Sequence, residues 1–239
     1  MVMIHGDDKG LVLPPRIAKI QAVMIPVGLT AKMTAEDKAA HLKRVDELYL
    51  TLKKSGIRTE LDVREGYTPA WKFNDWELKG VPLRLEFGPK DAAKDVVSYA
   101  RRDTGEKGTI PISELTTKIP ELLETIQADL YTKAEANFRA HRIQVTKWED
   151  VVPALDAKNL VLIPFCEAID CEDRIKVLTT GRTDESPDTP EAQKAPSMGM
   201  KSLCIPFEQP EGIVKGETKC LNPECTRNAV QWCMFGRSY

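Results

Sequence analysis

Two cysteine pairs with the same spacing limit how the second half of this chain can fold. Four residues separate the thiols in CEAIDC, residues 166–171, and again in CLNPEC, residues 220–225. The first pair follows an apolar run and precedes a helical pattern, whereas Asn222 and Pro223 favour a tight turn in the second pair. Two remote hairpins of this kind can bring four sulfur atoms around one ion.

The spacing leaves three interpretations of these thiols. The residue chemistry favours a structural zinc site, because four protein ligands leave no open position for catalysis. The alternatives are ordinary buried thiols, since a gap of four residues is less specific than a gap of two, and a redox pair. Cys204 and Cys233 lie in apolar runs and are predicted to be packing residues. The predicted zinc ligands are Cys166, Cys171, Cys220 and Cys225.

The start of the chain bears on the oxidation state of the cysteines. MVMIHGDDKG lacks the basic segment and apolar core of a signal peptide, and disulfides are rare in reducing compartments. MVMI directly before a loop suggests that the chain begins inside an element of a longer protein. The adjacent Asp7 and Asp8 favour a turn over a Mg²⁺ site. A run of about 18 apolar residues is absent from the sequence, so no transmembrane helix and no membrane partner are expected.

From residue 19 to about 140, strand and helix patterns alternate. Strands are predicted over 21–28, 57–63 and 81–88, with helices over 35–56 and 68–80 between them. DTGEK joins two more strands, 96–102 and 108–112, in a hairpin. A long helix is predicted over 114–145. This order predicts a compact α/β domain with a mixed sheet.

A second, smaller α/β unit follows. Residues 147–155 have a helical pattern, 159–165 read as a buried strand, and a helix is predicted from Cys171. Residues 180–199 are polar and aperiodic and are predicted to form a long loop, after which 202–207 resume a strand. The net charge of −2 gives no overall attraction to nucleic acid, so RNA contact requires a local basic patch.

Several segments together resemble the C-terminal half of eukaryote-type (cytoplasmic, archaeal-like) prolyl-tRNA synthetases. They are KFNDWELKGVPLRLEFGPKD (72–91), RRDTGEK (101–107), IPFCEAIDCED (163–173), APSMGMKSLCIPF (195–207) and FGRSY (235–239). HGDDKGLVLPPRIA resembles the segment after motif 3 of a class II catalytic domain. The resemblance implies a catalytic-domain remnant (1–18), a mixed-sheet class II anticodon-binding domain (19–135) and a smaller α/β zinc-binding domain (136–239).

The resemblance also implies a function. Enzymes of this family activate proline with ATP and Mg²⁺, transfer it to proline tRNA in the cytoplasm, and dimerise through the catalytic domain. The anticodon of that tRNA carries two adjacent guanines, which present acceptors at O6 and N7 and donors at N1 and N2. Glu77, Arg84 and Lys90 match the anticodon contacts of the family. Tyr239 resembles its terminal tyrosine, whose carboxylate helps to order the active site.

The chain departs from the family pattern in its catalytic motifs. Motifs 1 and 2 and the motif 3 arginine are absent, so the chain alone is expected to be monomeric and unable to make prolyl-adenylate. The alternative is a stand-alone RNA-binding or scaffolding module with a structural zinc site.

The predicted contact residues also have simpler interpretations. Arg84 fits a solvated sheet face, and Glu77 and Lys90 fit surface charges near a turn. Arg101 and Arg102 are predicted to be a solvated pair rather than a phosphate site. Three aromatic side chains can either stack on unpaired bases or enter the core. They are Trp71, Phe73 and Trp76.

Overall fold

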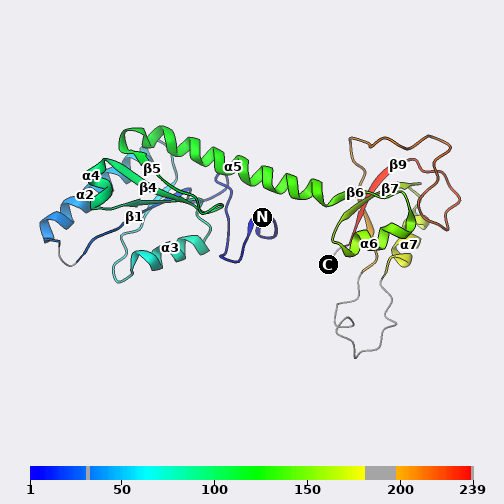
Figure 1. Ribbon diagram of the computed structural model, residues 1–239, viewed down its shortest axis with the longest axis horizontal. Helices are drawn as coiled ribbons and strands as arrows, with labels where there is room; N and C mark the ends of the chain where they lie inside the picture. Colours follow the sequence, from blue (N-terminus) through cyan, green and yellow to red (C-terminus); the bar gives the residue numbers. More distant parts are fainter. Residues whose placement is uncertain (31–32, 181–197, 238–239) are drawn as a thin grey trace, which may run out of the picture. The chain divides into compact units, whose positions relative to one another are not determined.

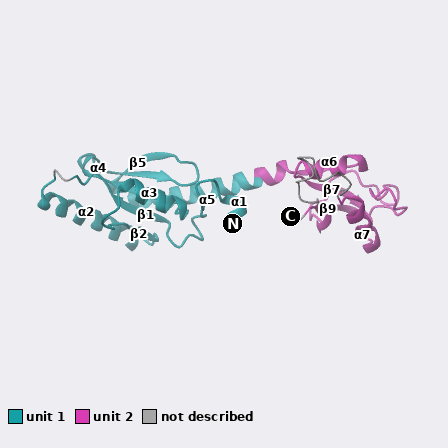
Figure 2. Ribbon diagram, turned by 90° about the horizontal axis from the view of Figure 1, so that it is seen from below, with its two compact units in different colours: residues 1–135 teal, residues 136–239 magenta. Residues whose placement is uncertain are grey.

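The computed structural model describes residues 1–30, 33–180 and 198–237, and the chain divides into two compact units (Figure 2). Unit 1 comprises residues 1–135 and unit 2 residues 136–239. Tyr239 and most of the predicted polar loop over 180–199 lie outside the described residues.

Unit 1 contains a five-stranded mixed sheet in the order β2-β1-β3-β4-β5. Figure 1 labels β1, β4 and β5 of this sheet. Its strands are β1 (Ala22–Pro26), β2 (Thr59–Leu61), β3 (Leu83–Phe87), β4 (Val96–Arg101) and β5 (Lys107–Pro111). β2 and β3 both pair with β1 in parallel, whereas β4 is antiparallel to β3 and to β5. Parallel neighbours need long crossover connections, which contain helices here. The predicted α/β class with a mixed sheet is confirmed.

Two helices of unit 1 begin at threonine residues that cap the first turn. The Oγ1 atom of Thr34 accepts a hydrogen bond from the Asp37 backbone N–H at 3.1 Å, and Thr68 does the same for Trp71 at 3.2 Å. A side-chain oxygen at this position satisfies an otherwise free N–H of the first turn. The helices are α1 (Val2–His5), α2 (Ala35–Lys54), α3 (Pro69–Leu78), α4 (Pro89–Lys94), the short 3-10 turn η1 (Ile112–Glu114) and α5 (Leu115–Ala140).

The alternation of side chains along the strands gives this sheet two different faces. Leu83, Leu85 and Phe87 of β3 enter the main core, which also contains buried residues of α2 and α5. Val23 and Ile25 of β1 lie in a smaller cluster with side chains of α3. The main core and α3 are therefore on opposite faces, and Arg84 shares the face of α3 because it alternates with Leu83 and Leu85.

Unit 2 contains a four-stranded sheet in the order β6-β7-β9-β8. Its strands are β6 (Arg142–Gln144), β7 (Leu160–Phe165), β8 (Lys201–Cys204) and β9 (Gln231–Gly236). The turn η2 (Trp148–Asp150) leads into α6 (Val151–Asp156), and α7 is Ile169–Leu178. Buried residues of α6 and α7 pack with one face of the sheet, and the other face carries a second cluster around Trp232.

Two sequence predictions for these units were wrong, and one strand was missed. The long helix ends at Ala140 and not at 145, because β6 pairs with β7 in parallel from Arg142. β9 was not predicted, although it is the central partner of both β7 and β8. Cys204 is exposed at the end of β8 and is not a packing residue, whereas Cys233 is buried as predicted.

Within the described part of the chain, no helix combines the length and the apolar character needed to cross a bilayer.

A buried carboxylate ties α3 to the sheet of unit 1. The side chain of Asp62 is fully buried and accepts hydrogen bonds from Arg64 Nε at 3.0 Å and from Trp76 Nε1 at 2.7 Å. The ammonium of Lys72, itself buried, lies 3.5 Å from the carboxylate. Burial raises the pKa of Asp62, but the hydrogen bonds from Arg64 and Trp76 outweigh it and hold the pKa well below 3.8.

The substitution Asp62→Asn should lower the free energy of unfolding by about 3–5 kcal/mol, because it leaves the Lys72 charge buried without its partner. Urea denaturation monitored by tryptophan fluorescence measures this change. Asp46→Asn on the exposed side of α2 is the matched control and should stay within about 0.5 kcal/mol of the native chain.

The effect of Asp62→Asn should also depend on pH. Since the folded-state pKa is below the unfolded value, the ionised carboxylate stabilises the fold above pH 3.8, and this stabilisation is lost as pH falls through the folded value. The difference in the free energy of unfolding between the native chain and Asp62→Asn should therefore narrow only in strongly acidic solution. Equal free energies of unfolding at neutral pH would contradict this role of Asp62.

Candidate functional site

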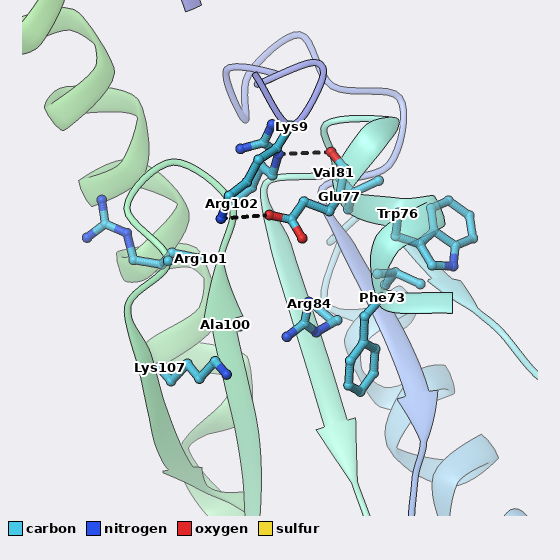
Figure 3. A pocket seen from close by; sticks show the side chains of 12 residues that line it. Lys9, Phe73, Trp76, Glu77, Val81, Arg84, Ala100, Arg101, Arg102 and Lys107 are labelled. Carbon is cyan, nitrogen blue, oxygen red and sulfur yellow. Dashed lines mark hydrogen bonds and ion pairs between the residues drawn. The ribbon is translucent and has the colours of Figure 1, made fainter. Parts of the chain in front are cut away.

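A pocket of about 210 Å³ lies on the α3 face of the first sheet (Figure 3). Its floor is a row of cross-strand neighbours, in which Val23 pairs with Arg84, Arg84 with Ala100, and Ala100 with Lys107. Side chains of α3 form one wall, and Lys9 reaches the pocket from the N-terminal segment. Four segments distant in sequence therefore meet at this site.

Arg84 projects from β3 into this pocket. Its Nε donates to Glu86 Oε1 at 2.9 Å, and its guanidinium carbon lies 4.0 Å from the centre of the Phe73 ring. Its side chain is 17% exposed, so a freely solvated position is wrong. Among the described residues, no acceptor meets its two terminal nitrogens, which therefore remain available for a ligand.

Glu77 contributes the carboxylate of the pocket from the last turn of α3. Its side chain is 29% exposed, and Lys9 Nζ lies 3.4 Å from Glu77 Oε1. The backbone carbonyl of Glu77 accepts a hydrogen bond from Arg102 Nε at 2.8 Å. The pocket thus places the carboxylate of Glu77 and the guanidinium of Arg84 in one cavity.

The prediction that Arg101 and Arg102 form a solvated pair is wrong, because both side chains are buried. Arg101 donates to Asp103 Oδ2 at 2.7 Å and to Asp129 of α5 at 2.5 Å, and Figure 3 shows it directed away from Arg84. Arg102 is bound by the carboxylate of Asp7 at 2.6 and 2.7 Å. Their charges are neutralised by the protein, so both arginines are structural parts of the pocket.

The remaining predicted contacts are divided between the pocket and its surroundings. Phe73 and Trp76 line the pocket, whereas Trp71 is exposed and stacks on Tyr67 at a centroid distance of 4.1 Å. Lys90 is exposed on α4 and is not a lining residue. Sequence reasoning missed Lys9 and Lys107. The hairpin register could have found Lys107, which pairs with Ala100, but no local pattern points to Lys9.

In unit 2, the two cysteine pairs form a single cluster. The sulfur atoms of Cys166, Cys171, Cys220 and Cys225 all lie within 4.8 Å of one another. Cys171 Sγ is 3.7 Å from Cys220 Sγ, and Cys166 Sγ is 3.7 Å from Cys225 Sγ. These separations exceed a disulfide bond of about 2.05 Å and match the edge of about 3.8 Å expected for thiolates around one tetrahedral zinc ion. The four cysteines could therefore hold a metal ion.

The backbone brings the two cysteine hairpins together. Cys166 follows β7 directly and Cys171 lies in the first turn of α7. The second hairpin is a tight turn, as Asn222 and Pro223 predicted, because Cys225 N–H donates to the Asn222 carbonyl at 3.0 Å. Leu221 N–H donates to the Pro164 carbonyl at 2.9 Å, so the second hairpin is fastened to β7.

Interactions around the cluster resemble those that support metal ligands elsewhere. The amide of buried Asn222 donates to Cys171 Sγ at 3.1 Å, which stabilises charge on that sulfur. Arg174 and Glu224 form an ion pair between α7 and the second hairpin, and Arg227 and Asp170 form another. Burial raises the pKa of the Cys220 thiol to about 11 and also raises that of Cys171. A bound divalent cation would supply the charge that favours deprotonation of these thiols.

Two family profiles match the chain. The profile described as "Anticodon binding domain" matches residues 21–122, which include Glu77, Arg84 and Lys90. The profile described as "Prolyl-tRNA synthetase, C-terminal" matches residues 148–239, which include the four clustered cysteines.

Similar proteins cover the whole of this chain. It is 46% identical to the bifunctional glutamate/proline–tRNA ligase of Drosophila melanogaster and 39% identical to the cytoplasmic proline–tRNA ligase of Arabidopsis thaliana, over 100% of its length. It is also similar to the crystal structure of prolyl-tRNA synthetase from Cryptosporidium parvum complexed with halofuginone and AMPPNP, with a TM-score of 0.85 and 42% identity. The chain spans 14%, 41% and 45% of these three proteins, respectively, and so less than half of each.

Proposed function

The chain belongs to the prolyl-tRNA synthetase family, and we propose that it is the part of such an enzyme that reads the anticodon of proline tRNA. Within it, residues 19–135 act as the anticodon-binding domain and residues 136–239 as a zinc-binding domain, and residues 1–18 are the end of a catalytic domain. The observation that carries the proposal is the presence of Glu77 and Arg84 in one pocket.

The chemistry of guanine supports this proposal. A carboxylate suits the N1 and N2 donors of guanine, and an arginine suits its O6 and N7 acceptors. Glu77 and Arg84 supply these two groups, while Phe73 and Trp76 supply apolar ring surface. The volume of about 210 Å³ is below the roughly 300–1,000 Å³ of pockets for drug-sized ligands, so it suits a single base.

The surroundings of the pocket suit the rest of the RNA. Lys107 at the end of the pocket floor has no acidic partner in the described part of the chain, and a free ammonium attracts phosphate. Lys90 lies outside the pocket, and we propose that it contacts the RNA beside the base that Arg84 and Glu77 read. The net charge of −2 does not oppose this proposal, because Arg84 and Lys107 provide positive charge within the same pocket.

The four-cysteine cluster is proposed to bind zinc as a structural ion. Cys166, Cys171, Cys220 and Cys225 would be its ligands, and four thiolates leave no position for water or substrate. When bound, zinc would add folding free energy to unit 2, which holds the cluster between β7, α7 and the second hairpin.

The catalytic steps are proposed to belong to another part of the enzyme. Activation of proline with ATP and Mg²⁺, and homodimerisation, would require the catalytic domain, which would be the neighbour of this chain. We also propose a cytoplasmic location, since one of the relatives is named cytoplasmic. Tyr239, for which a supporting role near the active site is proposed, lies outside the described residues.

Arg84→Ala should weaken the binding of an anticodon stem–loop RNA of proline tRNA by about 1–3 kcal/mol, because a bidentate contact to a guanine edge is lost. Replacement of each anticodon guanine by 7-deazaguanine, which lacks the N7 acceptor, should weaken native binding more than it weakens that of the variant. Fluorescence anisotropy measures both affinities. Lys43→Ala on α2 is the control, since α2 covers the opposite face of the sheet. Equal affinity of the native chain and Arg84→Ala for the guanine-bearing RNA would remove this assignment.

Cys171→Ser should reduce the metal content from about one zinc ion per chain to well below that value, since the tetrahedral site loses a ligand. Unit 2 should then lose amide protection in hydrogen exchange while unit 1 keeps it. Elemental analysis and exchange mass spectrometry provide these two readouts. Cys204→Ser is the matched control, because Cys204 is exposed and outside the cluster. If a chelator leaves the melting temperature of unit 2 unchanged, the proposed zinc ion is contradicted.

The isolated chain should show no proline-dependent exchange of pyrophosphate into ATP, because its described residues include no motif of the catalytic domain. The exchange assay is run beside a full-length enzyme of the same family as positive control. Exchange above background that follows the purified chain through chromatography would refute this expectation.

A further inference from the structure

A turn near the start of the chain lies against the residue that carries the pocket carboxylate. Asp7 and Gly10 pair through two backbone hydrogen bonds of 3.1 Å each, and the Lys9 backbone N–H donates to Asp7 Oδ1 at 2.9 Å. This closed turn fixes the backbone positions of Asp7 and Lys9 relative to each other. Both side chains act on Glu77, although about seventy residues separate them in sequence.

The first connection runs through Arg102 to the backbone of Glu77. Both oxygens of Asp7 accept from the Arg102 guanidinium at 2.6 and 2.7 Å, and Arg102 Nε donates to the Glu77 carbonyl at 2.8 Å. The side chain of Arg102 is only 4% exposed. The hydrogen bond from Arg102 holds the pKa of Asp7 well below its usual range, so the pair stays charged in neutral solution.

The second connection reaches the Glu77 side chain directly. Lys9 Nζ lies 3.4 Å from Glu77 Oε1, a separation at which charges attract without a close hydrogen bond (Figure 3). The ammonium therefore favours one direction of the carboxylate and leaves its lone pairs available to a ligand. Lys9 is also a lining residue of the pocket.

The backbone after the turn is fastened to the end of α3. Leu11 N–H donates to the Leu78 carbonyl and Leu13 N–H to the Gly80 carbonyl, both at 3.1 Å. Gly80 has a φ of 76°, and a Cβ atom there would lie 2.6 Å from the Leu11 carbonyl. The close approach of the two segments thus requires a glycine.

We propose that Asp7, Lys9 and Arg102 are positioning residues that hold Glu77 for base selection in the pocket. This inference rests on the proposed function, because it assumes that the pocket reads a guanine through Glu77. The three residues hold the backbone carbonyl and the carboxylate of Glu77 at the same time, so that the donors of guanine meet an acceptor that is already oriented. The selective site therefore extends into the segment that precedes the anticodon-binding domain.

The test compares two anticodon stem–loop RNAs, one with guanines at the two identity positions and one with inosines. Inosine lacks only the N2 amino group of guanine. The dissociation constant for the inosine RNA divided by that for the guanine RNA therefore reports the contact that a carboxylate makes with N2. Asp7→Asn should reduce this ratio by about tenfold, and Asp7→Glu should recover part of it. Asp8→Asn is the control, because Asp8 is exposed in the same turn and its side chain has no hydrogen bond or ion pair among the described residues.

A double-mutant cycle separates positioning from a general effect on the fold. If Asp7 acts through Glu77, then Asp7→Asn should change the ratio little in a chain that already carries Glu77→Gln. Additive effects of the two substitutions would overturn the inference. Lys9→Gln provides a second variant if Asp7→Asn does not fold, since the Lys9 side chain is 71% exposed and its loss should leave the melting temperature unchanged. A native ratio in folded Lys9→Gln would then refute the inference.

The outcomes also distinguish this inference from the proposed function. If neither Arg84→Ala nor Glu77→Gln changes RNA binding, the proposed function fails and the inference fails with it. If both weaken binding but folded Asp7→Asn keeps the native guanine-to-inosine ratio, only the positioning role is wrong.

Discussion

The alternation of side chains along β3 is the constraint on which unit 1 depends. Leu83, Leu85 and Phe87 fill the core between the sheet, α2 and α5, so Arg84 must point to the opposite face. A strand that is covered on both faces normally carries apolar residues throughout, as β1 does. A change of one residue in the pairing of β3 would move Arg84 into the core and remove the guanidinium from the pocket.

The elements that the sequence predicted well are those specified by local patterns. The apolar run of β1, the helical face of α2 and the capping threonines all act over a few residues, and the structure contains each of them. The partners of Arg101 and Arg102 could not be predicted in this way. Asp129 and Asp7 are 28 and 95 residues away from them, and only the tertiary fold brings them close. Two adjacent arginines before a hairpin therefore looked solvated although both are buried.

The cysteines illustrate the same limit in unit 2. Their spacing indicated two hairpins that could meet, but the separations of the sulfur atoms depend on how Leu221 is fastened to β7. The end of α5 was misplaced because β6 gains hydrogen bonds from β7, and this tertiary pairing outweighs the helical pattern that continues past Ala140. The exposure of Cys204 at an edge strand likewise depends on the order of the strands, which apolar composition does not specify.

The ion pair between Asp7 and Arg102 has a consequence for protein engineering. A chimera joined at residue 19, where the sequence suggests a domain border, would carry Arg102 into its new host without Asp7. That guanidinium would lose both of its hydrogen bonds to the Asp7 carboxylate. The exchangeable module of this protein therefore begins before Asp7, and a graft that includes this segment would transfer the pocket together with the residues that contact Glu77.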